Sequence, residues 1–308
     1  MKTYVVGGAI RDRLLGHIAT DRDYVVVGST PEQMSALGFE PVGKDFPVFL
    51  HPKTKEEYAL ARTERKSGQG YKGFSFFTSP EVSLEQDLQR RDFTINAMAQ
   101  EVDEEGNLIG PIIDPYGGQV DVEKRIFRHI SDSFQEDPLR ILRLARFLAR
   151  FKEFSVDSST QNLVAKMVQN KELQYLVPER IWQELSRGLM GAQPSRMLRF
   201  LADIGATDSL LPEHLSNTMV MAEVCRQLDE LAKNEIPLAQ RLAILLHQLS
   251  IEKMDIWLEH NRVPTELRDF AKVYARIHLF LSGNAMLPEH FMQLFERTDL
   301  WRKPKRFL

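Results

Sequence analysis

Residues 4–27 read YVVGGAIRDRLLGHIATDRDYVVV, and this stretch predicts a strand, a tight turn, a short helix and a second strand. Residues 4–6 are typical of a buried strand that ends at Gly7-Gly8. Residues 9–15 are typical of a helix that ends at Gly16. The β-branched run 23–27 predicts the next strand. An α/β unit therefore begins the chain.

The glycine pair between the first strand and the first helix suggests an anion site. Two glycines let the backbone approach a bulky group closely, and the N-terminus of the helix presents free N–H groups. Arg11 follows one turn into the helix, within reach of the same anion. The alternative is an ordinary tight turn beside a surface arginine.

Asp21 and Asp23 are two residues apart at the start of the second predicted strand. At strand spacing both carboxylates point to one face, where they repel each other unless a cation lies between them. Mg²⁺ takes oxygen ligands and is often held by one or two carboxylates together with substrate phosphates. The alternative is a turn that Asp21 caps while Asp23 is solvated. Glu57, in a later predicted strand, is a candidate third carboxylate or a surface residue.

The remainder of residues 1–136 mixes both kinds of secondary structure. Thr30 and Pro31 are typical of a helix start. Residues 48–50 and 57–61 predict strands around a turn, and residues 84–98 are expected to be helical at least in part. Residues 66–73, KSGQGYKG, have no apolar period and predict a loop.

From residue 137 onward apolar residues recur at helical spacing, most clearly in PLRILRLARFLARF, residues 138–151. Further helices are predicted at 158–170, 178–190, 194–204, 218–233, 237–249, 265–281 and 288–297. The expected fold is α+β, with a small mixed sheet and helices in the head, followed by an all-α C-terminal region.

The bulk composition excludes several classes of protein. A hydrophobic fraction of 43% and a charged fraction of 27% are globular values, which excludes a disordered chain. The sequence has neither the run of about 18 apolar residues that a membrane span needs nor a secretory signal at its start. The lone Cys225 excludes an internal disulfide, so we expect a cytoplasmic protein. A net charge of −3 neither supports nor excludes RNA binding.

Taken together, these motifs resemble a known family. YVVGGAIRDRLLG, TDRDYVVVGSTPEQM, GKDFPVFLHP, EEYALARTERKSGQGYKGF, LQRRDFTINAMA, DPYGGQVDVEKRIFRHI and EDPLRILRLARF cover residues 1–150 almost without a break. They are similar to the bacterial CCA-adding enzymes, which are class II tRNA nucleotidyltransferases with a polymerase β-like head. The likeness is weaker but continuous through LVPERIWQEL and LRFLADIGA.

The resemblance implies a role for each matching residue. It assigns the catalytic metal pair, with Mg²⁺ as cofactor, to Asp21 and Asp23, and it assigns nucleotide binding to Gly8, Arg11, Arg91, Asp137, Arg140 and Arg143. It also makes loop 66–73 a counterpart of the flexible loop that is linked to the change from adding C to adding A. Asp92 is expected to order Arg91 or to cap a helix.

The chemistry of the EDPLR motif agrees with a role in selecting the nucleotide. Asp137 and Arg140 lie three residues apart, a spacing that places two side chains on one side of a helix. A carboxylate can accept from an exocyclic amino group, which cytosine and adenine both carry. The alternative is that Asp137, before Pro138, caps a helix whose arginines, Arg143 included, form a solvated face.

The resemblance also suggests how the chain is divided. The expected parts are a catalytic head at 1–136, a nucleotide-selecting helical neck at 137–212 and a tRNA-binding helical body at 213–308. Related bacterial enzymes often carry a C-terminal HD phosphohydrolase domain, whereas His247-Gln248 stands here where His-Asp is expected. We therefore expect a degenerate HD region without phosphatase activity, with His247 as a core histidine.

The predicted activity is template-independent addition of CCA to tRNA 3′ ends, from CTP and ATP, with release of pyrophosphate. The predicted partners are these nucleotides and the acceptor arm and 3′ end of tRNA, with neither DNA nor a membrane involved. A poly(A) polymerase or a CC- or A-adding enzyme on the same fold is the nearest rival. A catalytically inactive RNA-binding protein is the second, although a pure binder has no need for the Asp21–Asp23 pair.

Overall fold

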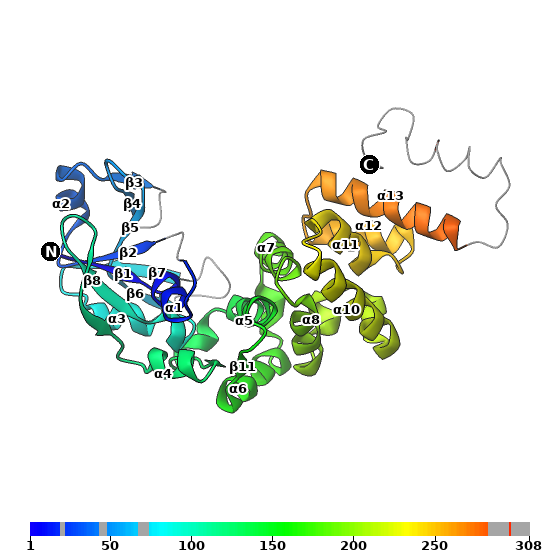
Figure 1. Ribbon diagram of the computed structural model, residues 1–308, viewed down its shortest axis with the longest axis horizontal. Coiled ribbons are helices and arrows are strands. Elements are labelled where there is room, and N and C mark those ends of the chain that lie inside the picture. The colour runs from blue at the N-terminus through cyan, green and yellow to red at the C-terminus, as the bar shows by residue number, and fades with distance from the viewer. Residues whose placement is uncertain (19–21, 43–47, 67–73, 283–295, 297–308) are drawn as a thin grey trace. The chain divides into compact units, whose positions relative to one another are not determined.

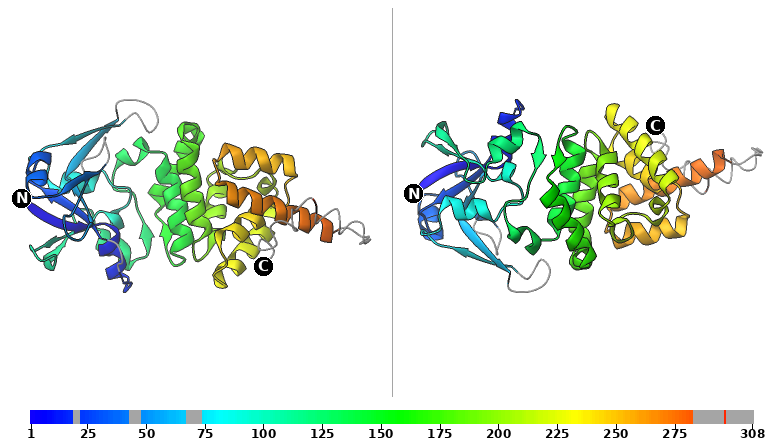
Figure 2. Two further views of the ribbon diagram at one scale, coloured as in Figure 1. Left: turned by 90° about the horizontal axis from the view of Figure 1, so that it is seen from above. Right: turned by 90° about the horizontal axis from the view of Figure 1, so that it is seen from below.

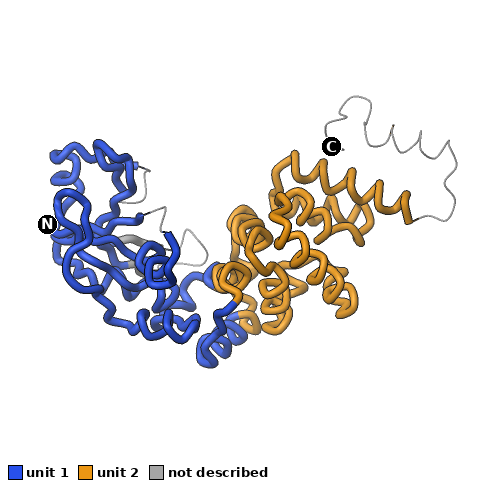
Figure 3. Tube along the Cα trace, in the orientation of Figure 1, with its two compact units in different colours: residues 1–140, 153–167 blue, residues 141–152, 168–308 orange. Residues whose placement is uncertain are grey.

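The computed structural model describes residues 1–18, 22–42, 48–66, 74–282 and 296. Its contacts divide the chain into two compact units, each of which is described by itself (Figure 3). Unit 1 contains residues 1–140 and 153–167, and unit 2 contains residues 141–152 and 168–308. The three-part division at residues 136 and 212 stays a prediction.

Unit 1 is built on a seven-stranded mixed sheet with the order β3-β4-β5-β2-β1-β8-β9 (Figure 1). Strands β2 and β5 are parallel, and the other neighbouring pairs are antiparallel. The strands are β1 (Lys2–Val6), β2 (Asp23–Val27), β3 (Glu40–Val42), β4 (Val48–Leu50), β5 (Glu57–Leu60), β8 (Ala99–Val102) and β9 (Leu108–Ile113). The predicted strands at 4–6, 23–27, 48–50 and 57–61 are confirmed.

Shorter elements surround this sheet. Two further strand pairs are antiparallel β6 (Arg62–Lys66) with β7 (Phe74–Thr78) and parallel β10 (Ile126–Phe127) with β11 (Ser155–Val156). The helices of unit 1 are α1 (Gly8–Leu14), α2 (Pro31–Ala36), α3 (Leu84–Gln89), α4 (Gly118–Glu123) and α6 (Ser158–Gln169), with 3-10 turns η2 (Thr94–Asn96) and η3 (Asp132–Glu136).

Both faces of the sheet are buried under other elements. One face joins the cluster of Tyr4, Val6, Val25, Ala61, Val82, Leu88, Ala97 and Ala99, in which Leu88 comes from α3. The opposite face joins the cluster of Val26, Met34, Phe49 and Leu60, in which Met34 comes from α2. Because successive residues of a strand point to opposite faces, the run of valines in β2 contributes to both clusters. The sheet is therefore a central layer packed on both faces, and this packing holds the ends of its strands in place.

Local signals place the helix ends of the head. Thr30 caps α2 in a capping box with Gln33, and Pro31 occupies the first turn, as predicted. Ser83 and Gln86 form a second capping box at α3. Helix α1 ends before Gly16, whose φ of 75° lies in the left-handed region that glycine tolerates.

Unit 2 is helical, which confirms the α+β fold class. Its described helices are α5 (Leu139–Arg150), which begins in unit 1, α7 (Pro178–Leu189), α8 (Pro194–Asp203), α9 (Thr207–Leu210), α10 (Thr218–Lys233), α11 (Leu238–Leu246), α12 (Ile251–His260) and α13 (Thr265–Leu281), with 3-10 turns η4 (Glu172–Tyr175) and η5 (Glu213–Ser216). Helix α10 packs on α8, and α13 packs on α11 (Figure 2). Gly191 allows close packing on α5, because a Cβ there would lie 2.7 Å from the backbone of Ala149.

The structure differs from the sequence prediction in several elements. Of the stretch 84–98, predicted to be helical at least in part, only α3 and η2 are helical. Phe93, between them, is extended and forms a β-bridge with His129. Helices α4, α9 and α12 and strands β3 and β6 to β11 were not predicted. The predicted helix at 288–297 lies, apart from Glu296, outside the described residues. Among the residues that the structure does describe, no helix is both long enough and apolar enough to cross a membrane.

Candidate active site

The turn between β1 and α1 is shaped by the close approach of an arginine. Gly7 has a φ of 68°, and its N–H donates a 2.9 Å hydrogen bond to the carbonyl of Met98. A Cβ at Gly7 would lie 2.9 Å from Nη1 of Arg91, so no larger residue fits there without displacing that guanidinium. A Cβ at Gly8 would lie 3.5 Å from Nη2 of Arg11. The two glycines therefore bring the backbone against two guanidinium groups.

Arg11 is buried, with 3% of the residue exposed. Its Nη1 donates a 2.6 Å hydrogen bond to Oδ1 of Asn96, and its Nε donates at 2.8 Å to Oδ1 of Asp12. The side chain is thus held at two points, which fixes the planar fork of donors that a guanidinium offers to phosphate oxygens.

Arg91 converges on the same asparagine. Its Nη1 donates to the backbone carbonyl of Asn96 at 3.4 Å, and its Nη2 donates to Oδ2 of Asp87 at 3.3 Å. Its Nε is buried and has no hydrogen-bond partner among the described residues. Arg11 and Arg91, which were predicted from separate motifs, are therefore brought together around Gly7, Gly8 and Asn96.

Asn96 is a site residue that sequence reasoning missed, although it lies inside the quoted stretch RRDFTINA. Its Oδ1 accepts from Arg11, and its Nδ2 donates at 2.9 Å to Oδ1 of Asp92. The same oxygen of Asp92 accepts from the N–H of Phe93 at 2.9 Å. Asp92 therefore orders Asn96 and the backbone that follows, and it acts on Arg91 through Asn96. The four-residue spacing from Asp92 to Asn96 was the signal available in the sequence.

Asp87, on α3, is the second residue that was missed. Its carboxylate is fully buried between two arginines, with Arg90 Nη2 at 2.8 Å and Arg91 Nη2 at 3.3 Å. The backbone N–H of Arg62 also donates to it, at 3.2 Å. Burial alone would raise the pKa of Asp87, but Arg90 and Arg91 outweigh burial and hold that pKa below its ordinary value. The group is therefore an anion at neutral pH.

Arg140 is tied to the same region through the backbone. Its Nη2 donates to the carbonyl of Arg90 at 2.5 Å, and its Nη1 donates to the carbonyl of Ser133 at 2.9 Å. Arg140 also lines a pocket of 280 Å³ together with Thr63, Gln86, Gln89, Arg90, Ser131, Ser133 and Glu136. Although partly engaged, Arg140 therefore lines an open polar pocket beside α3 rather than a solvated helix face.

Asp137 and Arg143 lie differently from what the sequence suggested. Asp137 precedes α5 rather than lying within it, because Pro138 opens the first turn and Oδ1 of Asp137 accepts from the N–H of Leu139 at 3.1 Å. The predicted cap is thus present. Arg143 lies further along α5 in unit 2, where its guanidinium is 5.9 Å from the ring centre of Phe147.

Of the two predicted metal ligands, Asp21 and Asp23, the structure describes Asp23. Asp23 begins β2 as an exposed residue, and its partner across the antiparallel pair is Val6, directly before Gly7. Asp21 lies outside the described residues. Glu57 begins the parallel neighbour β5, in which Tyr58 pairs with Tyr24 and stacks on it at 4.3 Å. The register therefore sets Asp23 and Glu57 side by side on the opposite face from the two tyrosines.

These carboxylates fit a divalent cation. Within the described part of the chain, the side chains of Asp23 and Glu57 make no hydrogen bond or ion pair with a protein group, and oxygen ligands are those that Mg²⁺ prefers. No cluster of three or more His, Cys, Asp or Glu residues suited to a metal is found in residues 1–18, 22–42, 48–66, 74–282 and 296.

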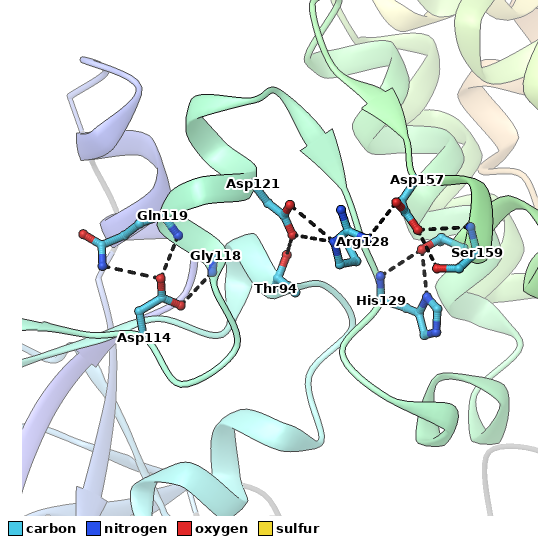
Figure 4. A network of polar contacts seen from close by, with 10 residues as sticks. Thr94, Asp114, Gly118, Gln119, Asp121, Arg128, His129, Asp157 and Ser159 are labelled. Atoms are coloured by element: carbon cyan, nitrogen blue, oxygen red, sulfur yellow. Dashed lines mark hydrogen bonds and ion pairs between the residues drawn. The ribbon is translucent and has the colours of Figure 1, made fainter.

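A polar network anchors the RRDFTINA segment to the rest of unit 1 (Figure 4). Oγ1 of Thr94 donates to Asp121 at 2.7 Å, Nε of Arg128 donates to Asp121 at 3.1 Å, and Nη1 of Arg128 donates to Asp157 at 2.7 Å. Asp157 directly precedes α6 and accepts from the N–H of Ser159. The segment that carries Asn96 is therefore fixed to α4 and to the start of α6.

His247 is buried in the core of unit 2. Nδ1 of His247 lies 2.7 Å from the carbonyl oxygen of Ile244, and its ring centre is 4.8 Å from that of His278. Burial lowers the pKa of His247, which favours the neutral ring. The prediction of a core histidine is confirmed, and the absence of phosphatase activity stays a prediction.

Comparison with known proteins agrees with this geometry. The family described as the head domain of poly A polymerase matches residues 3–128, and the family described as a probable RNA- and SrmB-binding site of polymerase A matches residues 153–217. The multifunctional CCA proteins of Cupriavidus necator and Burkholderia cenocepacia are 51% and 50% identical to the chain, and each alignment covers 100% of it and 82% of the relative.

Solved structures show the same fold. A tRNA nucleotidyltransferase complexed with a primer tRNA and an incoming ATP analog has a TM-score of 0.71 at 28% identity, over 99% of this chain and 88% of that one. The CCA-adding enzyme of Thermotoga maritima, complexed with tRNA, has a TM-score of 0.66 at 25% identity, over 98% of this chain and 77% of that one. The chain therefore belongs to the family of CCA-adding tRNA nucleotidyltransferases.

Proposed function

We propose that this chain completes tRNA by adding C, C and A to the 3′ end, from CTP and ATP, with release of pyrophosphate. The observation that carries the proposal is the convergence of Arg11 and Arg91 on Asn96 at the Gly7–Gly8 turn. Asp23 begins the strand directly across from Val6, which precedes that turn. Phosphoryl transfer uses cationic groups that hold the phosphates and acidic residues that hold metal ions, and the two arginines and Asp23 would supply both.

Asp21 and Asp23 would hold Mg²⁺, and Glu57, on the strand parallel to that of Asp23, would join them. When bound, such metals favour attack of the tRNA 3′ hydroxyl on the α-phosphate and neutralise the charge of the departing pyrophosphate. The role of the protein groups is to fix the oxygen ligands. The sheet would do so, because Asp23 and Glu57 begin neighbouring parallel strands.

Arg11 and Arg91 would bind the triphosphate, with Gly8 keeping the backbone out of its way. Both guanidiniums are held by acceptors of the protein itself. Because their positions are set in advance, little conformational freedom is lost on binding. Arginine suits this role, since its fork of donors matches phosphate oxygens.

Asp137 and Arg140 would select the base, with Arg143 assisting. Oδ1 of Asp137 caps α5. A carboxylate has two oxygens with about four acceptor positions, so this cap uses only part of its capacity to accept hydrogen bonds. Cytosine and adenine both offer an amino donor, whereas uracil and guanine place a carbonyl oxygen there. Arg140, anchored on two backbone carbonyls, would supply the complementary donors.

The helical region would hold the acceptor arm of tRNA through backbone and shape contacts, because the deep groove of A-form RNA is closed to side chains. Loop 66–73, assigned to the change from C to A addition, lies outside the described residues apart from Lys66.

Cys225 is buried and unpaired, which is consistent with a reducing cytoplasm as the place of action.

The direct test incubates tRNA that lacks CCA with the chain, CTP, ATP and Mg²⁺, and resolves the products at single-nucleotide resolution. We expect addition of three nucleotides and then a stop, with no product from Asp21→Ala or Asp23→Ala. A long A tail identifies a poly(A) polymerase, and a stop after CC or A addition alone identifies a partial enzyme. Tight tRNA binding without incorporation identifies an inactive binder, and full activity of both alanine variants contradicts the proposal.

A further inference from the structure

Asp87 links the part of the candidate site proposed to bind the triphosphate, at Arg91, with the part proposed to read the base, at Arg140. It lies on α3 with its side chain completely buried, although a buried carboxylate without partners is strongly unfavourable. Its Oδ1 accepts from Nε and Nη2 of Arg90, at 3.0 and 2.8 Å, and its Oδ2 accepts from Nη2 of Arg91. A single buried anion thus holds two consecutive arginines.

Because Asp87 lies near the end of α3, its contacts set the direction of the two arginine side chains that follow the helix. The helix ends at Gln89, and Arg90 is its C-cap, so the chain changes direction where the two arginines lie. Consecutive side chains at a helix end ordinarily diverge, but Asp87 is three and four residues before them and can reach both. The carboxylate therefore determines where Arg90 and Arg91 sit after the helix ends.

Each arginine carries this constraint to a different part of the site. The far side of Arg91 meets the Gly7 turn and the carbonyl of Asn96, where the triphosphate is proposed to bind. The backbone carbonyl of Arg90 accepts Nη2 of Arg140, which is proposed to read the base. Asp87 thus binds the proposed triphosphate contact, Arg91, directly and reaches the proposed base contact, Arg140, through Arg90. It lies away from the substrate itself because it is buried.

We propose that Asp87 is a positioning residue that sets Arg91 for the triphosphate and, through Arg90, sets Arg140 for the base; this inference rests on the function proposed above. Rigid support of contacting groups by a surrounding layer is a general requirement of precise sites. A purely structural role is the competing explanation, because Asp87 also binds the N–H of Arg62 and so joins α3 to β6.

The experiment compares wild-type chain with Asp87→Asn, which keeps the shape and removes the charge. Steady-state addition to tRNA lacking CCA gives KM and kcat for CTP and ATP, and UTP in place of CTP measures base selection. We expect KM for both nucleotides to rise about 10- to 100-fold, with UTP insertion increased relative to CTP. Calorimetric titration of CTP without tRNA should show the same loss of affinity.

Two further variants separate positioning from stability. Asp87→Glu retains the charge and should recover part of the loss in KM. Asp229→Asn is the matched control in unit 2, where Asp229 accepts from the N–H and Oγ of Ser195 at 3.0 and 2.7 Å. It should lower the thermal midpoint without changing KM or UTP insertion. If Asp87→Asn does not fold, Arg90→Lys is used instead; it keeps Asp87 paired with Arg91 and should raise UTP insertion with little change in KM.

The outcomes distinguish the two proposals. A wild-type chain that adds no nucleotide overturns the proposed function and this inference together. An active wild type, combined with an Asp87→Asn variant whose KM, CTP affinity and UTP insertion match those of Asp229→Asn, overturns the positioning role alone. A rise in KM and in UTP insertion, partly reversed by glutamate, supports it.

Discussion

The guanidinium of Arg11 and the side-chain oxygen of Asn96 are 85 residues apart in the chain and 2.6 Å apart in the structure. This hydrogen bond joins the helix after the glycine turn to the RRDFTINA segment. Asn96 also contacts Arg91 through its backbone carbonyl, so the two arginines proposed to bind phosphate share one support. The relationship makes Asn96 the first residue to test.

Asn96→Ala should weaken nucleotide binding and destabilise unit 1. The change leaves the buried Arg11 and Asp92 each without a partner at Asn96, and losing one partner of a buried polar group costs about 1–3 kcal/mol. We expect KM for CTP and ATP to rise and the free energy of unfolding to fall. Urea unfolding and steady-state kinetics measure the two effects. Asn107→Ala, at an exposed turn, is the control, and equal behaviour of both variants would contradict a role for Asn96.

Gly7→Ala and Gly16→Ala form a matched pair. Both glycines have positive φ, 68° and 75°, so both variants carry backbone strain of about 1–3 kcal/mol. A Cβ at Gly7 also meets Arg91 at 2.9 Å, whereas a Cβ at Gly16 has nothing within 4 Å. Both thermal midpoints should fall, but KM for CTP should rise in Gly7→Ala alone. An equal rise in both would show that strain, rather than Arg91, controls binding.

Glu57→Gln tests whether the metal site extends across to β5. If Glu57 shares the cation with Asp23, the variant should need about tenfold more Mg²⁺ for half-maximal nucleotide addition. Its maximal rate at saturating Mg²⁺ should recover in part. Glu40→Gln, an exposed glutamate of β3, is the control. A Mg²⁺ titration that overlays the wild-type curve would make Glu57 a surface strand residue. EDTA should stop addition by every active variant.

His247 should make unit 2 sensitive to mild acid. Burial lowers the pKa of His247, and neighbouring His278 lowers it further. The unfolded chain, with a histidine pKa of about 6.5, therefore binds the proton more readily than the folded chain. Stability is accordingly full above pH 6.5 and declines as pH falls below it, by at most about 1.4 kcal/mol per pH unit for one group.

His247→Leu should reduce this decline, measured by urea unfolding between pH 8 and pH 5. The exposed His17→Leu is the control and should keep the wild-type slope. An unchanged slope in His247→Leu would assign the acid sensitivity to other groups. His129 and His214, whose pKa values burial also lowers, are then the next candidates.

Much of the fold was predictable because its signals are local. The β-branched run 23–27 became β2, and Thr30 with Pro31 began α2. The amphipathic run after Pro138 became α5. Strands β3 and β6 to β11 were missed, because a strand is stabilised mainly by its neighbours and its own residues signal it weakly. Helices α4, α9 and α12 were missed as well.

The residues proposed to contact the nucleotide were predictable from the sequence, whereas the buried residues that hold them in position were not. Gly8, Arg11, Arg91 and Arg140 stand in motifs that the resemblance identified, and the structure places them around one turn and one adjoining pocket. Asp87 and Asn96 were not found, since a single aspartate or asparagine does not show in the sequence whether it will be buried, and the Asp92–Asn96 spacing alone does not show that Asn96 reaches Arg11.

The sequence alone determined the strand–turn–helix–strand start of the head, the helical character of the region after residue 137 and the types of residue that face a phosphate. It did so because backbone preferences and motif spacing act over a few positions. Tertiary structure alone decided that Asn96 supports Arg11 and that Asp87 holds Arg90 and Arg91 in a buried anion–guanidinium cluster. The physical reason is that burial and charge pairing depend on which distant segments the folded chain brings together.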